Sequence, residues 1–202
     1  ESGFNGVFLV ASNPVDIMTQ VVYELSGFPS GRVLGSGTTL DSARLRYMIG
    51  DYFHLNPRNV HAYVIGEHGD SEFVAWSNAM ISVIPISEFE EDNENMMENL
   101  RQIAVDVRES AYEIINAKGA TYYGIGMVLA RLSRAILNDE NSVFTVSAYL
   151  KGEYGHKGIY IGVPAVVNRN GVREILEMEL SDEEKEQFEK SCTVLNEMID
   201  EI

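Results

Sequence analysis

The chain has 202 residues, 45% of them hydrophobic, which is enough for one domain with a full core, or for one domain and part of another. Its 31 acidic side chains outnumber its 15 basic ones and give a net charge of −16, which argues against binding to nucleic acid or to an anionic membrane surface. An anionic ligand must therefore be held by a local cluster of basic groups.

The start of the chain has the pattern of a segment that already lies inside a fold. No initiator methionine, basic segment or long apolar run comes before residues 4–11, which have the composition of a sheet interior. We therefore expect a fragment or a processed form of a longer protein. The single cysteine, Cys192, excludes a disulfide within the chain, and without a secretion signal a reducing cytoplasm is the simplest compartment.

Strands and helices are predicted to alternate in the first part of the chain. Residues 7–11 form a continuous apolar run, typical of a parallel strand that is covered on both faces. A helix is expected to follow at once, with Asn13 as its N-cap and Pro14 at its first position. Residues 32–37 predict a short strand with a glycine-bearing turn, and residues 38–53 predict the next helix. Such alternation is typical of an α/β fold.

The middle of the chain is predicted to contain two strands and then two helices. Residues 60–65 form a strand that ends in a histidine-bearing loop, and residues 80–86 form the second strand. An acidic segment at 88–99 leads into a long helix that ends near Asn116. A further helix is expected over residues 121–137.

The last third predicts an antiparallel sheet followed by a terminal helix. Apolar or alternating runs cover residues 142–150, 158–167 and 172–180, and residues 168–171 are a strong tight-turn signal. Residues 181–184 form a capping box that opens the helix. The side chains expected on the buried stripe of this helix are Phe188, Cys192, Leu195 and Ile199.

Two short stretches, residues 41–44 and 66–71, hold side chains suited to proton transfer on a small anionic compound. A histidine beside a carboxylate can give or take a proton near neutral pH, and an arginine can hold a substrate carboxylate through two parallel bonds. A lone histidine is more often structural. A glycine on each side of Glu67–His68, however, permits unusual backbone angles at a strand end, where α/β sheets place their sites. We therefore interpret His68 as catalytic.

Helical geometry separates the arginines of the 38–53 helix. Asp41 and Arg44 are three residues apart and share a face, whereas Arg46 lies about 200° around the helix from Arg44. The two arginines therefore cannot serve one pocket. Taken alone, Asp41 and Arg44 are more often a surface ion pair, and the histidine loop is what favours a site.

Three blocks, in this order and at this spacing, resemble the L-lactate and malate dehydrogenase family. They are Asn-Pro-Val-Asp at 13–16, Gly-Thr-Thr-Leu-Asp-Ser-Ala-Arg at 37–44 and Gly-Glu-His-Gly-Asp-Ser-Glu at 66–72. The resemblance covers essentially the whole chain. It implies that residues 1–35 are the end of a nucleotide-binding Rossmann domain, and that residues 36–202 are an α+β substrate-binding and catalytic domain.

The resemblance also implies a role for each matching residue. His68 is expected to be the acid/base, Asp41 to orient and charge it, and Arg44 to grip the substrate carboxylate in a bidentate fork. Reduction of pyruvate places negative charge on the carbonyl oxygen, so a protonated His68 would stabilise that charge and supply the proton. The residues expected around substrate are Asn13 and Thr121, and those expected around the nicotinamide of NAD are Ala11, Ser12, Asn13, Ser36 and Ile125.

Pyruvate, reduced to (S)-lactate in fermentative glycolysis, is the expected substrate. Ala120, Thr121 and Ile125 predict a small, mostly apolar pocket that suits a methyl group better than a second carboxylate. Within the family, Glu67, Glu72 and the nearby tryptophan also favour the lactate branch. Oxaloacetate, and hence a malate enzyme, stays open, because the loop that best separates the two branches is absent.

The first half of the family's pattern is missing from the chain. The Gly35 to Gly37 and Gly124 to Gly126 pairs do not complete a G-x-G-x-x-G turn, and the acidic ribose ligand and the loop arginine that polarises the carbonyl are absent as well. This leaves a second class of function open. Without its cofactor half, the chain could be an inactive assembly or regulatory module that retains subunit interfaces and an anion site.

Arg46 and His61 have no part in the active site expected from the resemblance. Their positions are similar to those that bind fructose 1,6-bisphosphate in allosteric bacterial members of the family. A bisphosphate on an acidic protein needs clustered basic groups, and two subunits on a twofold axis would double each of them. We therefore expect a homo-oligomer, a tetramer by resemblance, with fructose 1,6-bisphosphate as activator and no metal site. The bland alternatives are a solvated arginine and a satisfied strand histidine.

Overall fold

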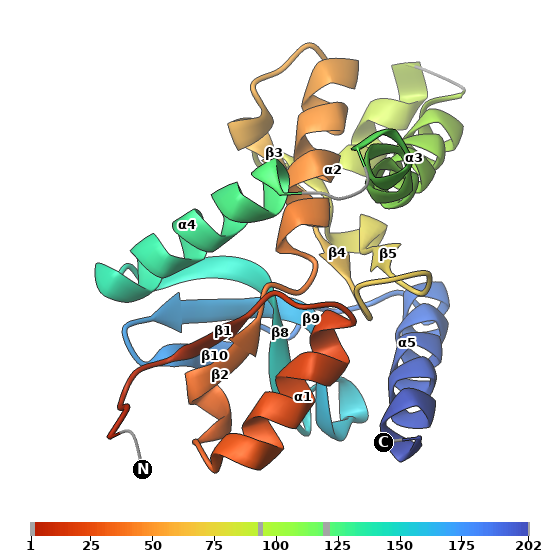
Figure 1. Ribbon diagram of the computed structural model, residues 1–202. Helices are drawn as coiled ribbons and strands as arrows, with labels where there is room; N and C mark the ends of the chain where they lie inside the picture. The colour runs from red at the N-terminus through yellow and green to blue at the C-terminus, as the bar shows by residue number, and fades with distance from the viewer. Residues whose placement is uncertain (1–2, 93–94, 119–121, 202) are drawn as a thin grey trace.

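A mixed five-stranded sheet lies at the centre of the computed structural model, which describes residues 3–92, 95–118 and 122–201 (Figure 1). The strand order is β1-β2-β8-β9-β10. β1 and β2 are parallel, and the remaining pairs are antiparallel. The strands are β1 (Phe8–Val10), β2 (Val33–Gly35), β8 (Ser142–Lys151), β9 (Lys157–Asn168) and β10 (Gly171–Ile175).

Five α-helices of the described residues pack around this sheet and around two smaller sheets beside it. α1, α4 and α5 each contact β9, and α1 also contacts α5, whereas α2 and α3 contact each other. The helices are α1 (Val15–Ser26), α2 (Thr39–Tyr52), α3 (Met96–Lys118), α4 (Tyr123–Leu137) and α5 (Asp182–Asp200). Short 3₁₀ helices are formed by Ser30–Arg32, Pro57–Asn59, Trp76–Asn78, Ile86–Asp92 and Glu153–Gly155.

Two small sheets connect α2 and α3 to the central sheet. The first has the order β3-β6-β7 and the second is the antiparallel pair of β4 and β5. Their strands are β3 (Val60–His61), β4 (Val64–Ile65), β5 (Phe73–Val74), β6 (Met80–Ile81) and β7 (Ile84–Pro85). No helix of the described residues is long and apolar enough to span a membrane.

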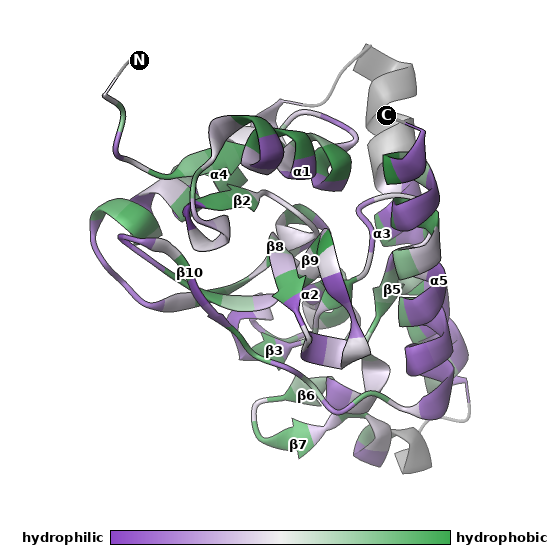
Figure 2. Ribbon diagram, turned by 90° about the horizontal axis from the view of Figure 1, so that it is seen from below, coloured by the Kyte–Doolittle hydropathy of each residue, from purple (hydrophilic) through white to green (hydrophobic). Residues whose placement is uncertain are grey.

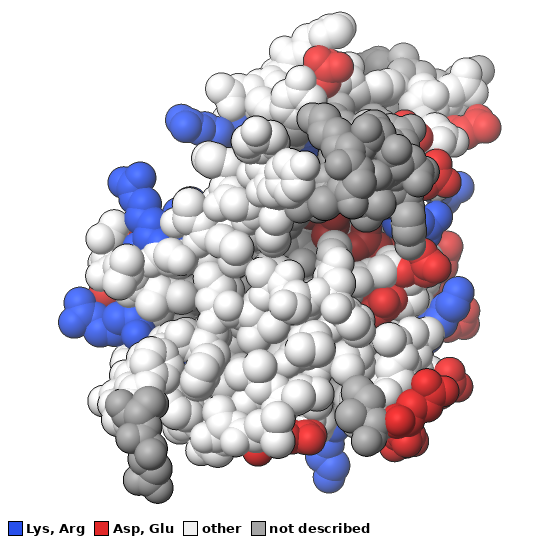
Figure 3. Space-filling view, viewed as in Figure 1, with Lys and Arg blue, Asp and Glu red and all other residues white. Residues whose placement is uncertain are grey.

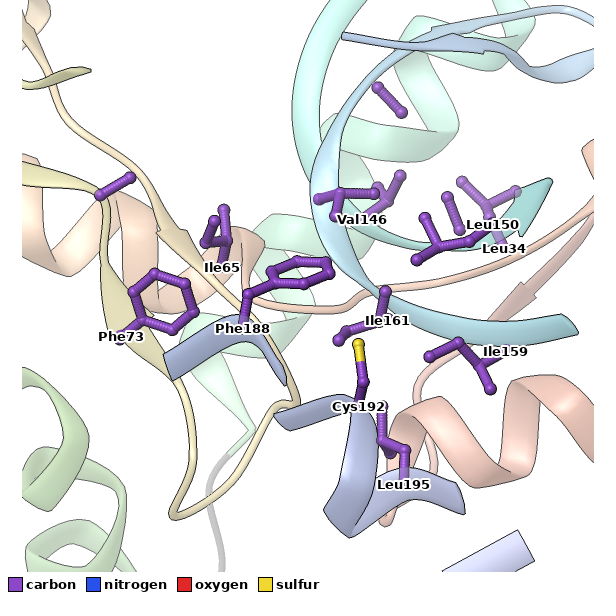
Figure 4. Packing of buried hydrophobic residues seen from close by; sticks show 14 of the residues in the cluster. Leu34, Ile65, Phe73, Val146, Leu150, Ile159, Ile161, Phe188, Cys192 and Leu195 are labelled. Carbon is purple, nitrogen blue, oxygen red and sulfur yellow. The ribbon is translucent and has the colours of Figure 1, made fainter. Parts of the chain in front are cut away.

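The β4–β5 pair lies between two hydrophobic cores. Successive side chains of a strand point to opposite faces. Ile65 and Phe73 accordingly join the core around the central sheet and α5, where the ring of Phe73 lies 6.5 Å from that of Phe188 (Figure 4). Val64 and Val74 join the other core, between α2 and α3. The loop that connects β4 to β5 is therefore held at its base from both sides.

Several sequence-based predictions are confirmed. The mixed α/β class is present, and α2 and β2 fall within the predicted segments. Ser181 and Glu184 form the predicted capping box at the start of α5. The predicted stripe on α5 faces the core, with Phe188, Cys192 and Leu195 buried, and Figure 2 shows hydrophilic residues along the outer side of this helix.

The start of α1 differs from the prediction. Asn13 is not its N-cap, because Pro14 is extended, with ψ of 119°, and itself occupies the cap position. The helix therefore begins at Val15, and a cis peptide bond joins Asn13 to Pro14. This places Asn13 outside the helix, in the segment that follows β1.

Three predicted strands are shorter or broken. Residues 60–65 form two strands, β3 and β4, because the two pieces pair with different partners. Residues 80–86 form the β6–β7 hairpin, because Ser82 takes a left-handed conformation, with φ of +56°, and turns the chain. The last predicted strand ends at Ile175 rather than Leu180, because a bulge after Val172 shifts its register and the chain then leaves β9.

The parallel and antiparallel parts form one sheet rather than two. β2 pairs with β8 through Gly35 and Ser147, so the sheet runs across the position at which we place the domain boundary. A side chain at Gly35 would collide with Thr19 of α1 and Ser147 of β8, so this strand has to approach its neighbours closely. β1 is an edge strand of this sheet, with half-buried residues.

Candidate active site

Asp41, Arg44, His68 and Glu72 converge where α2 meets the β4–β5 loop. Asp41 and Arg44 project from the first two turns of α2, and His68 and Glu72 belong to the loop. Thr38 ties the start of α2 to this region, because its hydroxyl donates to the Val64 carbonyl at 2.6 Å. The structure thus brings the two predicted stretches together, and Asp41 and Arg44 share a helix face as predicted.

The loop begins with a close approach between two backbones. Gly66 and Gly162 of β9 exchange two hydrogen bonds, each 3.0 Å long. Gly66 has φ of +97°, and a Cβ at Gly162 would lie 2.7 Å from the Gly66 carbonyl oxygen. Farther along, Glu67 accepts hydrogen bonds from both the backbone and the hydroxyl of Ser71. The loop around His68 is therefore closed and fixed.

His68 lies between two buried carboxylates. Its Nδ1 atom is 2.9 Å from Oδ2 of Asp41 and 3.6 Å from Oε2 of Glu72. The Asp41 and Glu72 side chains are 3% and 6% exposed, whereas that of His68 is 25% exposed. Because Nδ1 itself is buried, the exposed part of the ring lies elsewhere. This arrangement leaves Nε2 available to a substrate.

The charges around His68 oppose the effect of its burial. Burial lowers the pKa of His68, but Asp41 and Glu72 outweigh this effect, so the pKa is raised above its ordinary value of 6.5. The pKa of Glu72 is also raised, mainly by burial. The pair of carboxylates therefore favours the imidazolium form of His68, which is the form that can donate a proton.

Arg44 contacts one of the two carboxylates, that of Asp41. Its Nη1 atom lies 3.5 Å from Oδ1 of Asp41, and its side chain is 19% exposed. No other hydrogen bond of the guanidinium is present among the described residues, so its remaining N–H groups can bind an anion. A guanidinium next to an imidazolium suits a substrate that carries both a carboxylate and a carbonyl group.

Asp16, in the first turn of α1, contacts the loop that bears His68. It is 2% exposed, and its Oδ2 accepts a hydrogen bond from the backbone N–H of His68 at 2.8 Å. Burial raises the pKa of Asp16 from 3.8 to about 6, although the His68 contact and Ser147 lower it. Ionisation therefore opposes folding: the penalty is absent below pH 3.8 and complete above pH 6. At 1.36 kcal/mol per pKa unit, it amounts to roughly 3 kcal/mol.

The residues expected around the nicotinamide lie at one edge of the central sheet. Ala11, Ser12 and Asn13 follow β1 and are exposed, and Ser36 follows the parallel β2. The backbone N–H of Ser36 donates to the Val10 carbonyl at 2.8 Å, so the two strand ends lie side by side. The carboxyl ends of parallel strands are where α/β sheets bind ligands. Ile125 of α4 is half-buried, and Thr121 and Ala120 lie outside the described residues.

Arg46 contacts the backbone next to His61, whereas Arg44 contacts Asp41. The Nε atom of Arg46 donates to the Ala62 carbonyl at 2.9 Å, and its guanidinium carbon lies 4.8 Å from the centre of the Tyr63 ring. Partial burial lowers the pKa of Arg46. His61 is exposed on β3, next to Ala62. The separation of the two arginines therefore follows the helical prediction.

The structure has two large cavities among the described residues, of which one borders the cluster around His68. One of about 470 Å³ borders Glu72 on one side and Arg101 and Arg108 of α3 on another. A second, of about 750 Å³, lies between α5 and the segment after β10, and its lining does not include Asp41, Arg44, His68 or Glu72. Its histidine, His156, is 3.0 Å from Glu189. The cluster around His68 is the candidate active site, because a histidine and an arginine there contact the same buried aspartate.

Sequence reasoning gave no catalytic role to Glu72 or Asp16. Glu72 lies four residues after His68, but a loop has no fixed spacing from which its contact could be predicted. Asp16 is 52 residues from His68 in the sequence, so only the fold brings them together. The presence of Asp16 in the Asn-Pro-Val-Asp block was the one available signal.

Comparisons with known proteins agree on one family. A family model described as the lactate/malate dehydrogenase alpha/beta C-terminal domain matches residues 38–202. L-lactate dehydrogenase 1 of Bacillus cereus (strain ATCC 10987 / NRS 248) is 59% identical over 198 residues, which are 98% of this chain and 63% of the relative. L-lactate dehydrogenase 2 of Bacillus anthracis is 60% identical over the same shares.

The structural comparison gives the same result. The crystal structure of the minor L-lactate dehydrogenase from Enterococcus mundtii in its ligands-bound form has a TM-score of 0.95 and 48% sequence identity, and the match covers 100% of this chain and 64% of that chain. The chain thus spans slightly less than two thirds of the length of these relatives.

Proposed function

Because this chain belongs to the lactate/malate dehydrogenase family, we propose that the whole protein is an NAD-dependent L-lactate dehydrogenase that reduces pyruvate to (S)-lactate. The observation that carries the proposal is the position of His68, whose Nδ1 is buried against Asp41 and Glu72. The guanidinium of Arg44 lies 3.5 Å from the same Asp41. This set of groups matches what a 2-oxo acid needs for reduction.

His68 supplies the proton of the reaction. In the direction of pyruvate reduction, the carbonyl oxygen becomes negative, and the proton on Nε2 of His68 moves to it and yields the hydroxyl of lactate. In the reverse direction, the neutral Nε2 accepts that proton. Asp41 stays against Nδ1 throughout, so it fixes the ring and stabilises the imidazolium. Bound NADH supplies the hydride.

Arg44 orients the substrate. Two parallel N–H to oxygen bonds to the substrate carboxylate would fix which face of the carbonyl meets the cofactor. Asp41 lies against one end of the guanidinium, so it limits how that group can turn. The proton donor and the carboxylate holder are therefore positioned by the same aspartate.

The residues at the edge of the sheet fit the nicotinamide end of NAD. Ala11, Ser12 and Asn13 are exposed at the end of β1, beside the end of β2 with Ser36. Asn13 is three residues before Asp16, which contacts the His68 backbone. Ala11, Ser12, Asn13 and Ser36 are therefore the residues that would hold the nicotinamide, which would supply the hydride. The 202 residues contain no glycine-rich phosphate turn, so we assign them no part in holding the pyrophosphate.

The enzyme is expected to work in fermentative glycolysis in the cytoplasm, as a homotetramer. Large apolar side chains on α1 and α4 support association, because several are more than 70% exposed. They are Leu25, Tyr123, Met127 and Leu137. Figure 3 shows a broad area without charge on this side of the molecule, whereas acidic side chains gather toward α5.

The specificity constants of the N-terminally extended protein for pyruvate and oxaloacetate test the proposal. We expect NADH-dependent reduction of both, with pyruvate preferred. A higher value for oxaloacetate would make the protein a malate dehydrogenase. The absence of NADH binding in both the extended protein and the 202-residue chain would instead favour a non-catalytic assembly or regulatory module.

Fructose 1,6-bisphosphate is the proposed activator, held by Arg46 and His61. The proposal is supported by the bond from Arg46 to the carbonyl of Ala62, the residue that follows the exposed His61 of β3. Charge-assisted bonds to phosphate are worth about 1.5–3 kcal/mol each, which is enough in sum to bias a two-state interface. A twofold axis at this surface would bring four such groups together.

Titration of the full-length enzyme with fructose 1,6-bisphosphate tests this site. We expect a higher affinity for pyruvate in the parent enzyme, and a weak response in the Arg46→Gln variant. An unresponsive parent enzyme, or an equal response in the variant, would show that the site is elsewhere.

A further inference from the structure

We propose that Asp16 is a positioning residue for the acid/base, and that it sets the place of His68 relative to the strand end expected to face the cofactor. The contact is direct, since Oδ2 of Asp16 accepts the backbone N–H of His68 at 2.8 Å. The inference rests on the proposed function, because it concerns the reaction that His68 would catalyse.

Asp16 itself is rigidly held. It lies in the first turn of α1, where its neighbours Val15 and Ile17 are 1% and 4% exposed. The helix packs on β2 so closely that a Cβ at Gly35 would lie 3.2 Å from the Val15 side chain. A carboxylate on such a helix cannot follow a moving loop, so the loop has to conform to it.

The loop leaves this bond to His68. Gly66 is fixed to β9 by two backbone hydrogen bonds, and the hydroxyl of Ser191 of α5 donates to the Ser71 carbonyl at 2.7 Å. These bonds secure both ends of the 66–72 segment and leave the backbone at His68 between them. The bond from Asp16 therefore controls where the imidazole starts, while Asp41 controls how it turns.

The same carboxylate is linked to the cofactor edge. Asp16 follows the Asn13–Pro14 pair, which leads out of β1 into the helix. Asn13 is a residue expected beside the substrate carbonyl and the nicotinamide, and only two residues separate it from Asp16. One short segment thus contacts the backbone of His68 and is expected to face the nicotinamide, and hydride and proton transfer require aligned positions.

A purely structural role is the competing explanation. An acidic side chain in the first turn of a helix interacts favourably with the helix dipole, and a buried aspartate needs a hydrogen-bond donor. Asp16 could serve both purposes in the folded enzyme without any effect on the rate of the reaction. The two roles differ in whether a folded variant that lacks the acceptor has an altered rate of chemistry.

The test uses three substitutions in the full-length enzyme. Asp16→Asn keeps an acceptor oxygen for the His68 N–H, whereas Asp16→Leu and the smaller Asp16→Ala remove it. Gln20→Leu is the matched control, because Gln20 is a buried polar residue one turn farther along α1 whose amide bonds only to Glu24 within the described part of the chain. Single-turnover hydride transfer, the Kd for NADH and amide hydrogen exchange of the 66–72 segment are measured for each variant.

We expect Asp16→Leu and Asp16→Ala to slow hydride transfer by about 10- to 100-fold, the range for a lost alignment, with the Kd for NADH changed less than about threefold. The His68 amide should exchange faster in both variants, without cofactor present. Asp16→Asn should restore protection and most of the rate, and Gln20→Leu should resemble the parent enzyme.

Three results would overturn the inference: a folded Asp16→Leu or Asp16→Ala enzyme with the parent rate, unchanged exchange at His68, or an equal loss of rate in Asp16→Asn. A parent enzyme that binds NADH but reduces no 2-oxo acid would instead refute the proposed function. The exchange measurement would still decide the contact in that case, so the two failures are distinguishable.

Discussion

Replacing His68 by glutamine in the full-length enzyme is expected to slow pyruvate reduction by about 10²–10⁴-fold, the usual worth of a positioned acid/base. Glutamine is similar in size and still polar, so the pocket between Asp41 and Glu72 should persist, but the side chain has no proton to give at neutral pH. Turnover and the Kd for NADH, measured on the same preparations, check this. The rate should collapse while cofactor binding changes little.

The matched control is His156→Gln. This histidine also has a carboxylate partner, Glu189 at 3.0 Å, but it lines the cavity between α5 and the segment after β10, not the one that borders Glu72. Its variant should turn over at the parent rate. Near-normal turnover of His68→Gln would refute the assignment of His68, and an equal loss in both variants would indicate a general effect on folding.

Replacing Arg44 by lysine should raise the Michaelis constant for pyruvate by about 10- to 100-fold. Lysine keeps the charge but is a point charge, and it cannot form the two parallel bonds that a guanidinium offers to a carboxylate. A lost charge-assisted bond is worth about 1.5–3 kcal/mol, which corresponds to this range. The remaining positive charge should keep the fold and the contact with Asp41 largely intact.

Steady-state kinetics with pyruvate measure this effect, and Arg58→Lys is the control. Arg58 is exposed near the start of β3 and its side chain has no partner among the described residues. Its substitution should leave the Michaelis constant unchanged. If Arg44→Lys does the same, the carboxylate of the substrate is held by another group.

The sequence predicted the parts of the site that depend on local spacing. The Asp41 and Arg44 pair follows from helical geometry, and the separation of Arg46 follows from the same rule. The loop at a strand end follows from Gly66, whose φ is positive. The resemblance of the three blocks to the lactate and malate dehydrogenase family is confirmed by the family model and by the relatives.

The contacts that only the fold creates were not predicted. Asp16 and Glu72 reach His68 across a helix packing and a loop closure, for which sequence spacing gives no rule. The break at residues 60–65 has a similar cause. Val60 and Val64 are both buried and apolar, so the pattern predicts one strand, but tertiary pairing with β6 and β5 divides it. The division of this segment into two strands therefore depends on pairing between distant parts of the chain, which the local pattern does not show.

The unusual feature of the site is the excess of buried negative charge around one imidazole. Asp41 and Glu72 contact the ring and Asp16 contacts its backbone, while the protein as a whole already has a net charge of −16. Burial alone would lower the pKa of His68 and leave it neutral. The carboxylates reverse that effect, so they favour the protonated imidazole that the proposed reaction requires.

The pH dependence of kcat/KM for pyruvate tests this claim most directly. Because the proposed reduction of pyruvate uses protonated His68, activity should persist below the raised pKa and fall as pH rises through it, while lactate oxidation should rise over the same interval. The account predicts a midpoint above 6.5, the ordinary value, and a shift to lower pH in Asp41→Asn. A midpoint at or below 6.5 in the parent enzyme, or the same midpoint in Asp41→Asn, would contradict it.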